Sequence, residues 1–265
     1  MLWAMARSGR MDIWRLATAW LSAAEAALLG RGRPEPTRAL EACLALAGGG
    51  AWCGRCGASM PQVSAGAAGV SRVEPGPAVC AHCGGAGPFD GFVRLGRYAP
   101  PLDRAVRRVK EQAWHAMAHA MGVQLGLMAR RELAAPSEPW IVVPAPADPW
   151  RRLARGIDHA HAIAQGVAQG CGGRVMRALR ATHRSRQASM DRARRWSRRG
   201  RMRLRARVAA RLRGRSVLLV DDIRTTSATL LEGRELLILA GVKSVSAAVV
   251  CVADRTQTPI KIDVA

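Results

Sequence analysis

Short apolar segments alternate with longer amphipathic ones in the C-terminal part of the chain. Three short segments consist almost entirely of aliphatic residues, namely 141–143, 216–220 and 245–252. Runs without polar alternation are typical of strands that are buried on both faces of a parallel sheet. Residues 157–167 and 228–240 have the apolar spacing of helices. The pattern predicts an α/β fold, a mostly parallel sheet flanked by helices.

Two further elements precede these strands. Residues 92–98 alternate apolar and polar side chains, which predicts a half-buried strand. Pro100 and Pro101 then open a stretch with apolar residues at helical spacing, which predicts one long helix that ends at Arg131. Its apolar positions are Leu102, Val106, Val109, Ala113, Met117 and Met121.

Composition divides the chain into three parts. Residues 1–40 are rich in alanine and predict a helical N-terminal segment. Residues 43–90 are rich in glycine, proline and cysteine, which predicts a small Cys-rich module. Residues 91–265 hold the α/β domain. A length of 265 residues is sufficient for one such domain and a small accessory module.

The seven cysteines include two C-x-x-C pairs, Cys53 with Cys56 and Cys80 with Cys83. An odd number of cysteines argues against a disulfide framework. Four thiolates in two knuckles form a tetrahedral ligand set for zinc, with no open position for catalysis. The spacing therefore predicts a structural zinc site in a zinc-ribbon-like module. The alternative is four reduced thiols in a flexible loop.

The most informative run is 217–229, in which an apolar strand leads into Asp221 and Asp222. Parallel strands deliver such residues to the edge of the sheet where ligands bind. Two carboxylates there can accept hydrogen bonds from neighbouring sugar hydroxyls, and the start of the following helix suits a phosphate. The alternative is a strand followed by an ordinary capped helix. The hydroxyl donors of the turn are Thr225, Thr226, Ser227 and Thr229.

This run resembles the phosphoribosyl pyrophosphate fingerprint of type I phosphoribosyltransferases, in which two acids precede Thr-Thr-Gly-x-Thr. Ser227 stands at the position of the glycine. Other segments resemble the ComF competence-protein family, in order, between Cys43 and Val252. They are Tyr98–Leu102, Val109–Lys110, Val142–Pro146, Arg151–Ala160 and Arg180–Thr182.

The resemblance implies a phosphoribosyl pyrophosphate-type ligand bound with Mg²⁺. It places the loop after Val143 near the pyrophosphate, with Arg151, Arg152 and Arg155 as contacts. It also implies a link to DNA uptake, with proteins of the competence machinery as partners. The sequence identifies no acceptor nucleophile, so a transferase and a non-enzymatic protein with a sensory or vestigial site both remain open. Members of that family often carry more cysteine pairs in this module, and because further pairs are missing here we expect one zinc, with Cys43 as a spare or substitute ligand.

Positive charge dominates the chain. The formal net charge is +22, and nearly all of it comes from arginine. The segment 177–215 has sixteen arginines and one acid, Asp191. Arginines around the indole of Trp196 suit single-stranded DNA, because guanidinium groups bind phosphates and indoles stack on bases. The alternative is a solvated basic surface over the ligand site.

Charged residues interrupt every apolar stretch, which predicts no membrane-spanning helix. The N-terminal residues 1–29 contain Asp12, Arg15 and Glu25 within their apolar part. This pattern favours an amphipathic helix over a signal peptide. We therefore expect a cytoplasmic protein.

Overall fold

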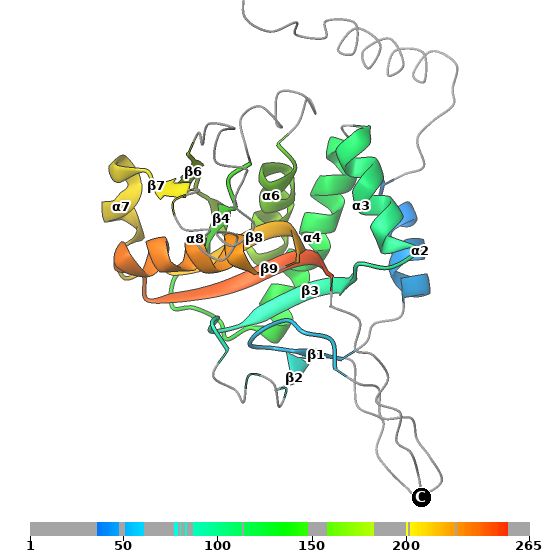
Figure 1. The fold of residues 1–265 in the computed structure, drawn as a ribbon, viewed down its shortest axis with the longest axis horizontal. Coiled ribbons are helices and arrows are strands. Elements are labelled where there is room, and N and C mark those ends of the chain that lie inside the picture. The colour runs from blue at the N-terminus through cyan, green and yellow to red at the C-terminus, as the bar shows by residue number, and fades with distance from the viewer. Residues whose placement is uncertain are drawn as a thin grey trace, which may run out of the picture.

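The computed structural model has a five-stranded parallel sheet at its centre (Figure 1). Its strands are β3 (Phe92–Arg97), β4 (Ile141–Pro144), β5 (Arg174–Val175), β8 (Ser216–Arg224) and β9 (Ser244–Val252). They lie in the order β3-β9-β8-β4-β5, and each neighbouring pair is parallel. The structure describes residues 36–47, 51–60, 77–78, 80, 83, 87–112, 114–147, 158–182, 200, 202–225 and 227–253.

Two small sheets accompany the central one. The strands β1 (Trp52–Cys53) and β2 (Pro77–Ala78) pair in parallel within the cysteine module. The strands β6 (Leu179–Ala181) and β7 (Met202–Leu204) form an antiparallel ribbon before the helix that leads to β8.

Helices cover both faces of the central sheet. One face carries α2 (Pro36–Ala47), α3 (Leu102–Glu111), α4 (His115–Glu132) and α6 (His159–Cys171). The other carries α7 (Ala206–Leu212) and α8 (Ala228–Leu239), and α2 and α7 lie at opposite ends of the molecule (Figure 1).

Strand β8 shows how the sequence builds these layers. Leu218 and Val220 pack into the core below α4 and α6, whereas Val217 and Leu219 pack into the core below α8. Successive side chains of a strand point to opposite faces, so an unbroken apolar run is required when both faces are covered. The predicted fold class is confirmed.

Close approach of α4 and α6 depends on glycine. A Cβ atom at Gly122 would lie 2.0 Å from the carbonyl oxygen of Ile163, and one at Gly166 would lie 2.1 Å from that of His119. Only glycine allows the two backbones to come this close. The packing fixes where α6 begins relative to the end of α3.

Three predicted elements differ from the structure. The long helix that we expected from Pro101 to Arg131 is two helices, because α3 ends at Glu111 and the buried Trp114 precedes α4. The strand β3 was expected to bury alternate side chains, but Phe92, Val93 and Arg94 are all buried. Arg94 is buried because the cysteine module packs against it. Strand β8 continues four residues past Val220 because it remains paired with β9.

Helix α2 crosses the expected boundary between residues 40 and 43 and packs on the core of the central sheet. The domain limits themselves stay a prediction. Within the described residues, no helix has the length and apolar character needed to span a membrane. Residues 1–35 lie outside the described part of the chain.

Candidate functional site

The connections of the sheet place a topological switch point between β4 and β8. From β4 the chain passes through α6 to β5 on one side, and it later returns to β8 on the other side of β4. In open α/β sheets, ligands bind beyond the carboxyl ends of strands at such a switch point. The pairing of β4 with β8 ends at Pro144 and Val220, whereas β8 remains paired with β9 to Arg224. The end of β8 therefore extends past β4 at this point.

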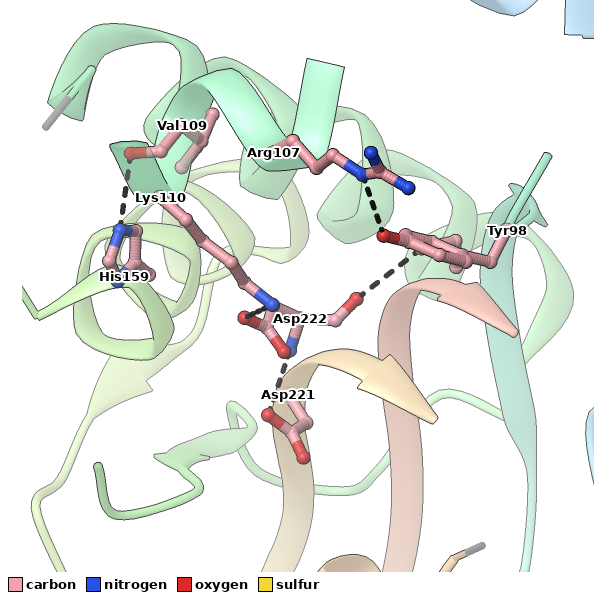
Figure 2. A network of polar contacts seen from close by, with 8 residues as sticks. Tyr98, Arg107, Val109, Lys110, His159, Asp221 and Asp222 are labelled. Atoms are coloured by element: carbon pink, nitrogen blue, oxygen red, sulfur yellow. Dashed lines mark hydrogen bonds and ion pairs between the residues drawn. The ribbon is translucent and has the colours of Figure 1, made fainter. Parts of the chain in front are cut away.

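Asp221 and Asp222 lie on this extended part of β8 (Figure 2). The Asp222 carboxylate points toward Lys110 of α3, whereas the Asp221 side chain points away from it (Figure 2). The Oδ2 atom of Asp222 lies 2.8 Å from the Nζ atom of Lys110. The Oδ1 atom of Asp221 accepts a hydrogen bond from the Asp222 backbone N–H at 2.9 Å.

The two carboxyl groups differ in their electrostatics. Burial raises the pKa of Asp221 to about 7, and the neighbouring Asp222 carboxylate adds to this rise. The hydrogen bond from the Asp222 N–H and the charge of Lys110 act in the opposite direction. Near neutral pH, Asp221 is therefore close to its titration point.

The turn after the acid pair opens helix α8. Ser227 is the N-cap residue and has a left-handed backbone, with φ 59° and ψ −6°. The Nη1 atom of Arg224 donates a hydrogen bond to the Ser227 hydroxyl at 3.2 Å. Thr225 is exposed, and Thr229 lies in the first turn of α8. Thr226 lies outside the described residues.

The backbone conformation of Ser227 explains why the phosphoribosyl pyrophosphate fingerprint has a glycine at this position. A residue with φ near +60° adopts a conformation that glycine reaches without steric cost. We did not predict this geometry, but the replaced glycine was a sequence signal for it.

Lys110 joins this site from the last turn of α3. Its neighbour Val109 is buried, and the Val109 carbonyl oxygen lies 3.1 Å from the Nε2 atom of the buried His159 (Figure 2). His159 is the first residue of α6, and Asp158 caps that helix by accepting a hydrogen bond from the His161 N–H. The end of α3 is thus connected both to β8 and to the start of α6.

The sequence analysis did not assign a role to Lys110. Two signals were available: Lys110 belongs to a segment that resembles the ComF family, and it is one of three lysines in an arginine-rich chain. The three arginines that we expected at the pyrophosphate, Arg151, Arg152 and Arg155, lie outside the described residues.

The four cysteines of the two knuckles come together as predicted. Their Sγ atoms all lie within 4.8 Å of one another, with 3.4 Å between Cys53 and Cys83 and 3.6 Å between Cys56 and Cys80. Sulfur atoms around a tetrahedral zinc with bonds of about 2.3 Å are about 3.8 Å apart. The cluster can therefore hold a metal ion. Among the described residues, this is the one cluster of side chains that could bind a metal ion. Cys43 is not part of it and packs against the core from α2.

The cysteine module is attached to the edge strand β3. The indole Nε1 of Trp52 donates to the Phe92 carbonyl oxygen at 3.0 Å, and the buried Arg94 donates to that of Gly57 at 3.2 Å. Gly57 has a positive φ of 72°, and a Cβ atom there would lie 2.2 Å from the Phe92 ring. The knuckle is thus shaped to fit the strand. It also covers part of an edge that would otherwise be open for pairing.

Part of the arginine segment forms the β6–β7 ribbon. Arg180 lies directly opposite Arg203, and both side chains are exposed. The ribbon is held to α8 by Glu232, whose Oε1 atom accepts hydrogen bonds from the backbone N–H groups of Gly200 and Met202. Residues 183–199, including Trp196, lie outside the described residues.

Sequence comparison finds a family that matches the region around the end of β8. Residues 155–264 match the family described as the phosphoribosyl transferase domain. This part of the chain is similar to a phosphoribosyl transferase domain. The match includes the acid pair, the turn at Ser227 and the helix that follows. The narrower resemblance to the ComF family is not part of this match.

Two solved structures align with about half of this chain. One is titled the allosteric regulatory enzyme of purine biosynthesis, with 20% identity and a TM-score of 0.33. Another is the glutamine phosphoribosylpyrophosphate amidotransferase from B. subtilis complexed with ADP and GMP, with 22% identity and the same score. Each alignment covers 49% of this chain and about a quarter of the other protein, 25% and 26% respectively. No curated protein matches this chain.

Proposed function

We propose that the site at the end of β8 binds a 5-phosphoribosyl pyrophosphate-type ligand together with Mg²⁺. The observation that carries this proposal is the sequence Asp221–Asp222 at the extended end of β8, followed by a left-handed turn into α8. This arrangement lies at the topological switch point and within the matched domain.

Each part of the site has a chemical role in this proposal. Asp221 and Asp222 accept hydrogen bonds from the ribose hydroxyls. The N-terminus of α8 and its hydroxyls receive the 5-phosphate, because free N–H groups and the helix dipole favour an anion. Mg²⁺ would neutralise charge on the ligand's phosphate groups, and it would need few protein ligands, as is usual for this ion at phosphate sites. The hydroxyls are those of Thr225, Thr226, Ser227 and Thr229, and Arg151, Arg152 and Arg155 contact the pyrophosphate.

Titration calorimetry with phosphoribosyl pyrophosphate and Mg²⁺ tests the site. We expect micromolar binding by the wild-type protein and its loss in an Asp221→Asn/Asp222→Asn variant. A matched control is Glu138→Gln/Glu235→Gln, which removes the same charge from two exposed carboxylates elsewhere. Equal binding by the wild type and the aspartate variant would refute the assignment.

The wider role that we propose follows the ComF resemblance. The protein would act in the cytoplasm in DNA uptake, with proteins of the competence machinery as partners. Ligand binding is the core of the proposal, and pyrophosphate release upon addition of candidate acceptor bases distinguishes a transferase from a binding protein.

A second candidate function is binding of single-stranded DNA by the arginine segment 177–215. The observation in its favour is the pair Arg180 and Arg203. Like charges directly opposite each other destabilise a strand pair, and a phosphate between them removes that cost. Both side chains are exposed and come from a ribbon that Glu232 anchors to α8.

A salt titration with a labelled oligonucleotide tests this function. Replacement of both ribbon arginines by alanine is expected to make the slope of log affinity against log salt shallower by about 1.4. The control is Arg130→Ala/Arg131→Ala, two exposed arginines on α4. Affinity that does not depend on salt would exclude the mechanism.

A further inference from the structure

Lys110 places an ammonium group at the end of β8. Its Nζ atom lies 2.8 Å from Asp222, and the two side chains are 23% and 22% exposed. A ligand at this site can therefore reach both groups. Helix α3 and strand β8 are more than 100 residues apart in sequence, so only the fold brings this charge to the site.

The faces of the sheet place Lys110 at one end of the expected ligand. Helix α8, which would receive the 5-phosphate, packs on the face of Val217 and Leu219. Lys110 meets Asp222 on the opposite face, together with α4 and α6. A ligand with its 5-phosphate at α8 and its ribose over the acid pair extends its other end toward α3. That end carries the pyrophosphate.

The position of Lys110 is fixed by its own helix. Val109 is 2% exposed, and its carbonyl oxygen contacts the buried His159 at the start of α6. Val106 and Leu102 anchor the preceding turns in the same core. The backbone of Lys110 is thus fixed, whereas its long, flexible side chain can change rotamer. This flexibility is required if the ammonium group exchanges one anionic partner for another.

Charge balance gives Lys110 a reason to contact the ligand. Two adjacent carboxylates would repel a pyrophosphate, and a nearby ammonium offsets that repulsion. Lysine binds phosphate as a point charge without a fixed geometry. Release of Asp222 from its ion pair also frees a carboxylate oxygen to accept a hydrogen bond from the ribose.

We infer that Lys110 is a ligand-binding residue that exchanges its ion pair with Asp222 for the pyrophosphate oxygens of the bound ligand. The inference rests on the proposed function of this site. In the absence of ligand, the Asp222 carboxylate then takes the place next to Lys110 that a phosphate group of the ligand would occupy.

Calorimetry on the full chain with Mg²⁺ tests this role with two probes, phosphoribosyl pyrophosphate and ribose 5-phosphate. We expect Lys110→Met to weaken binding of the pyrophosphate compound by about tenfold or more, as for lost hydrogen bonds to charged groups. Binding of ribose 5-phosphate is expected to change by less than about threefold. Lys110→Arg keeps the charge and is expected to restore most of the affinity.

The matched control is Lys243→Met, which removes the same side chain directly before β9, at the amino-terminal end of the parallel strands. It is expected to bind both probes like the wild type. Thermal unfolding of every variant, with Lys110→Gln as a second replacement, separates lost contact from lost folding.

The outcomes distinguish the inference from the function on which it rests. Wild-type binding with an unchanged Lys110→Met variant would overturn the role of Lys110 alone. Equal loss of both probes, without rescue by arginine, would show a structural role and would also overturn it. Failure of the wild type to bind either probe would refute the proposed function, and the inference would fall with it.

Discussion

At the end of β8, two neighbouring carboxyl groups have different surroundings. Asp222 has a lysine partner at 2.8 Å, whereas Asp221 has its pKa raised to about 7 by burial and by the charge of Asp222. The difference arises because the Asp222 side chain points toward Lys110, whereas the Asp221 side chain points away from it (Figure 2). Residue-scale predictions therefore concern charge and backbone conformation at this turn.

Ligand affinity is expected to depend on the protonation of Asp221. Below its pKa of about 7 the carboxyl group is neutral, and it binds ribose hydroxyls and Mg²⁺-bound ligand less well than the carboxylate. Affinity should therefore rise as the pH increases from about 6 to about 8. Calorimetry over this range measures the effect, and Asp221→Asn should flatten it. An unchanged pH profile in that variant would assign the titration to another group.

The left-handed backbone of Ser227 predicts a gain on replacement by glycine. This conformation costs a non-glycine residue about 1–2 kcal/mol, partly offset by the greater freedom of glycine in the unfolded chain. Ser227→Gly should thus raise the free energy of unfolding by up to about 1 kcal/mol. Ser216→Gly, in a strand of ordinary conformation, is the control and should lower it. Denaturant titration compares the two variants.

Among the elements, the pair α4 and α6 sets the position of the site most directly. Glycines at their contact bring the backbones together, and α6 then meets the last turn of α3 through His159. The predicted single helix 101–131 missed the break at Trp114, because the apolar spacing alone is compatible with a continuous helix. The break lets α3 pack at a different angle and direct Lys110 to β8.

Gly122→Ala tests this packing. The added Cβ would lie 2.0 Å from the carbonyl oxygen of Ile163, so the helices must move apart. We expect a loss of about 1–3 kcal/mol in the free energy of unfolding, as for other overpacked contacts. Leu127→Ala on the exposed side of the same helix should change it by less than about 0.5 kcal/mol. Equal effects of the two variants would contradict the contact.

At the scale of the whole molecule, the cysteine module and the central sheet share an interface at β3. The knuckle is connected to the strand by Trp52, Arg94 and Gly57, so a metal ion bound by the four cysteines would also support the edge of the central sheet. The chain is therefore expected to respond to metal loss as a unit.

We expect one zinc ion per chain by native mass spectrometry. Removal of the ion by a chelator should lower the melting temperature by about 5 °C or more, because structural zinc contributes directly to folding. Cys80→Ser should lose the ion, whereas Cys171→Ser, outside the cluster, should retain it. A protein without metal in chelator-free buffer would refute the site.

The sequence by itself determined the α/β class, the two cysteine pairs and the run from Val217 to Thr229. Each of these depends on residues that are close in the chain, where spacing alone limits the geometry. The glycine-like turn at Ser227 was also visible as a departure from a fingerprint. The acid pair and the turn form a site only because β8 and the elements packed against it bring further residues next to them.

The tertiary structure alone decided which groups meet. It extended β8 through the acid pair, brought Lys110 to Asp222 and placed Arg180 opposite Arg203. It also buried Arg94 beneath the cysteine module. Such contacts join residues that are distant in the chain, and their geometry depends on helix packing and strand register. A single sequence carries no direct record of either, because both result from the packing of all elements together.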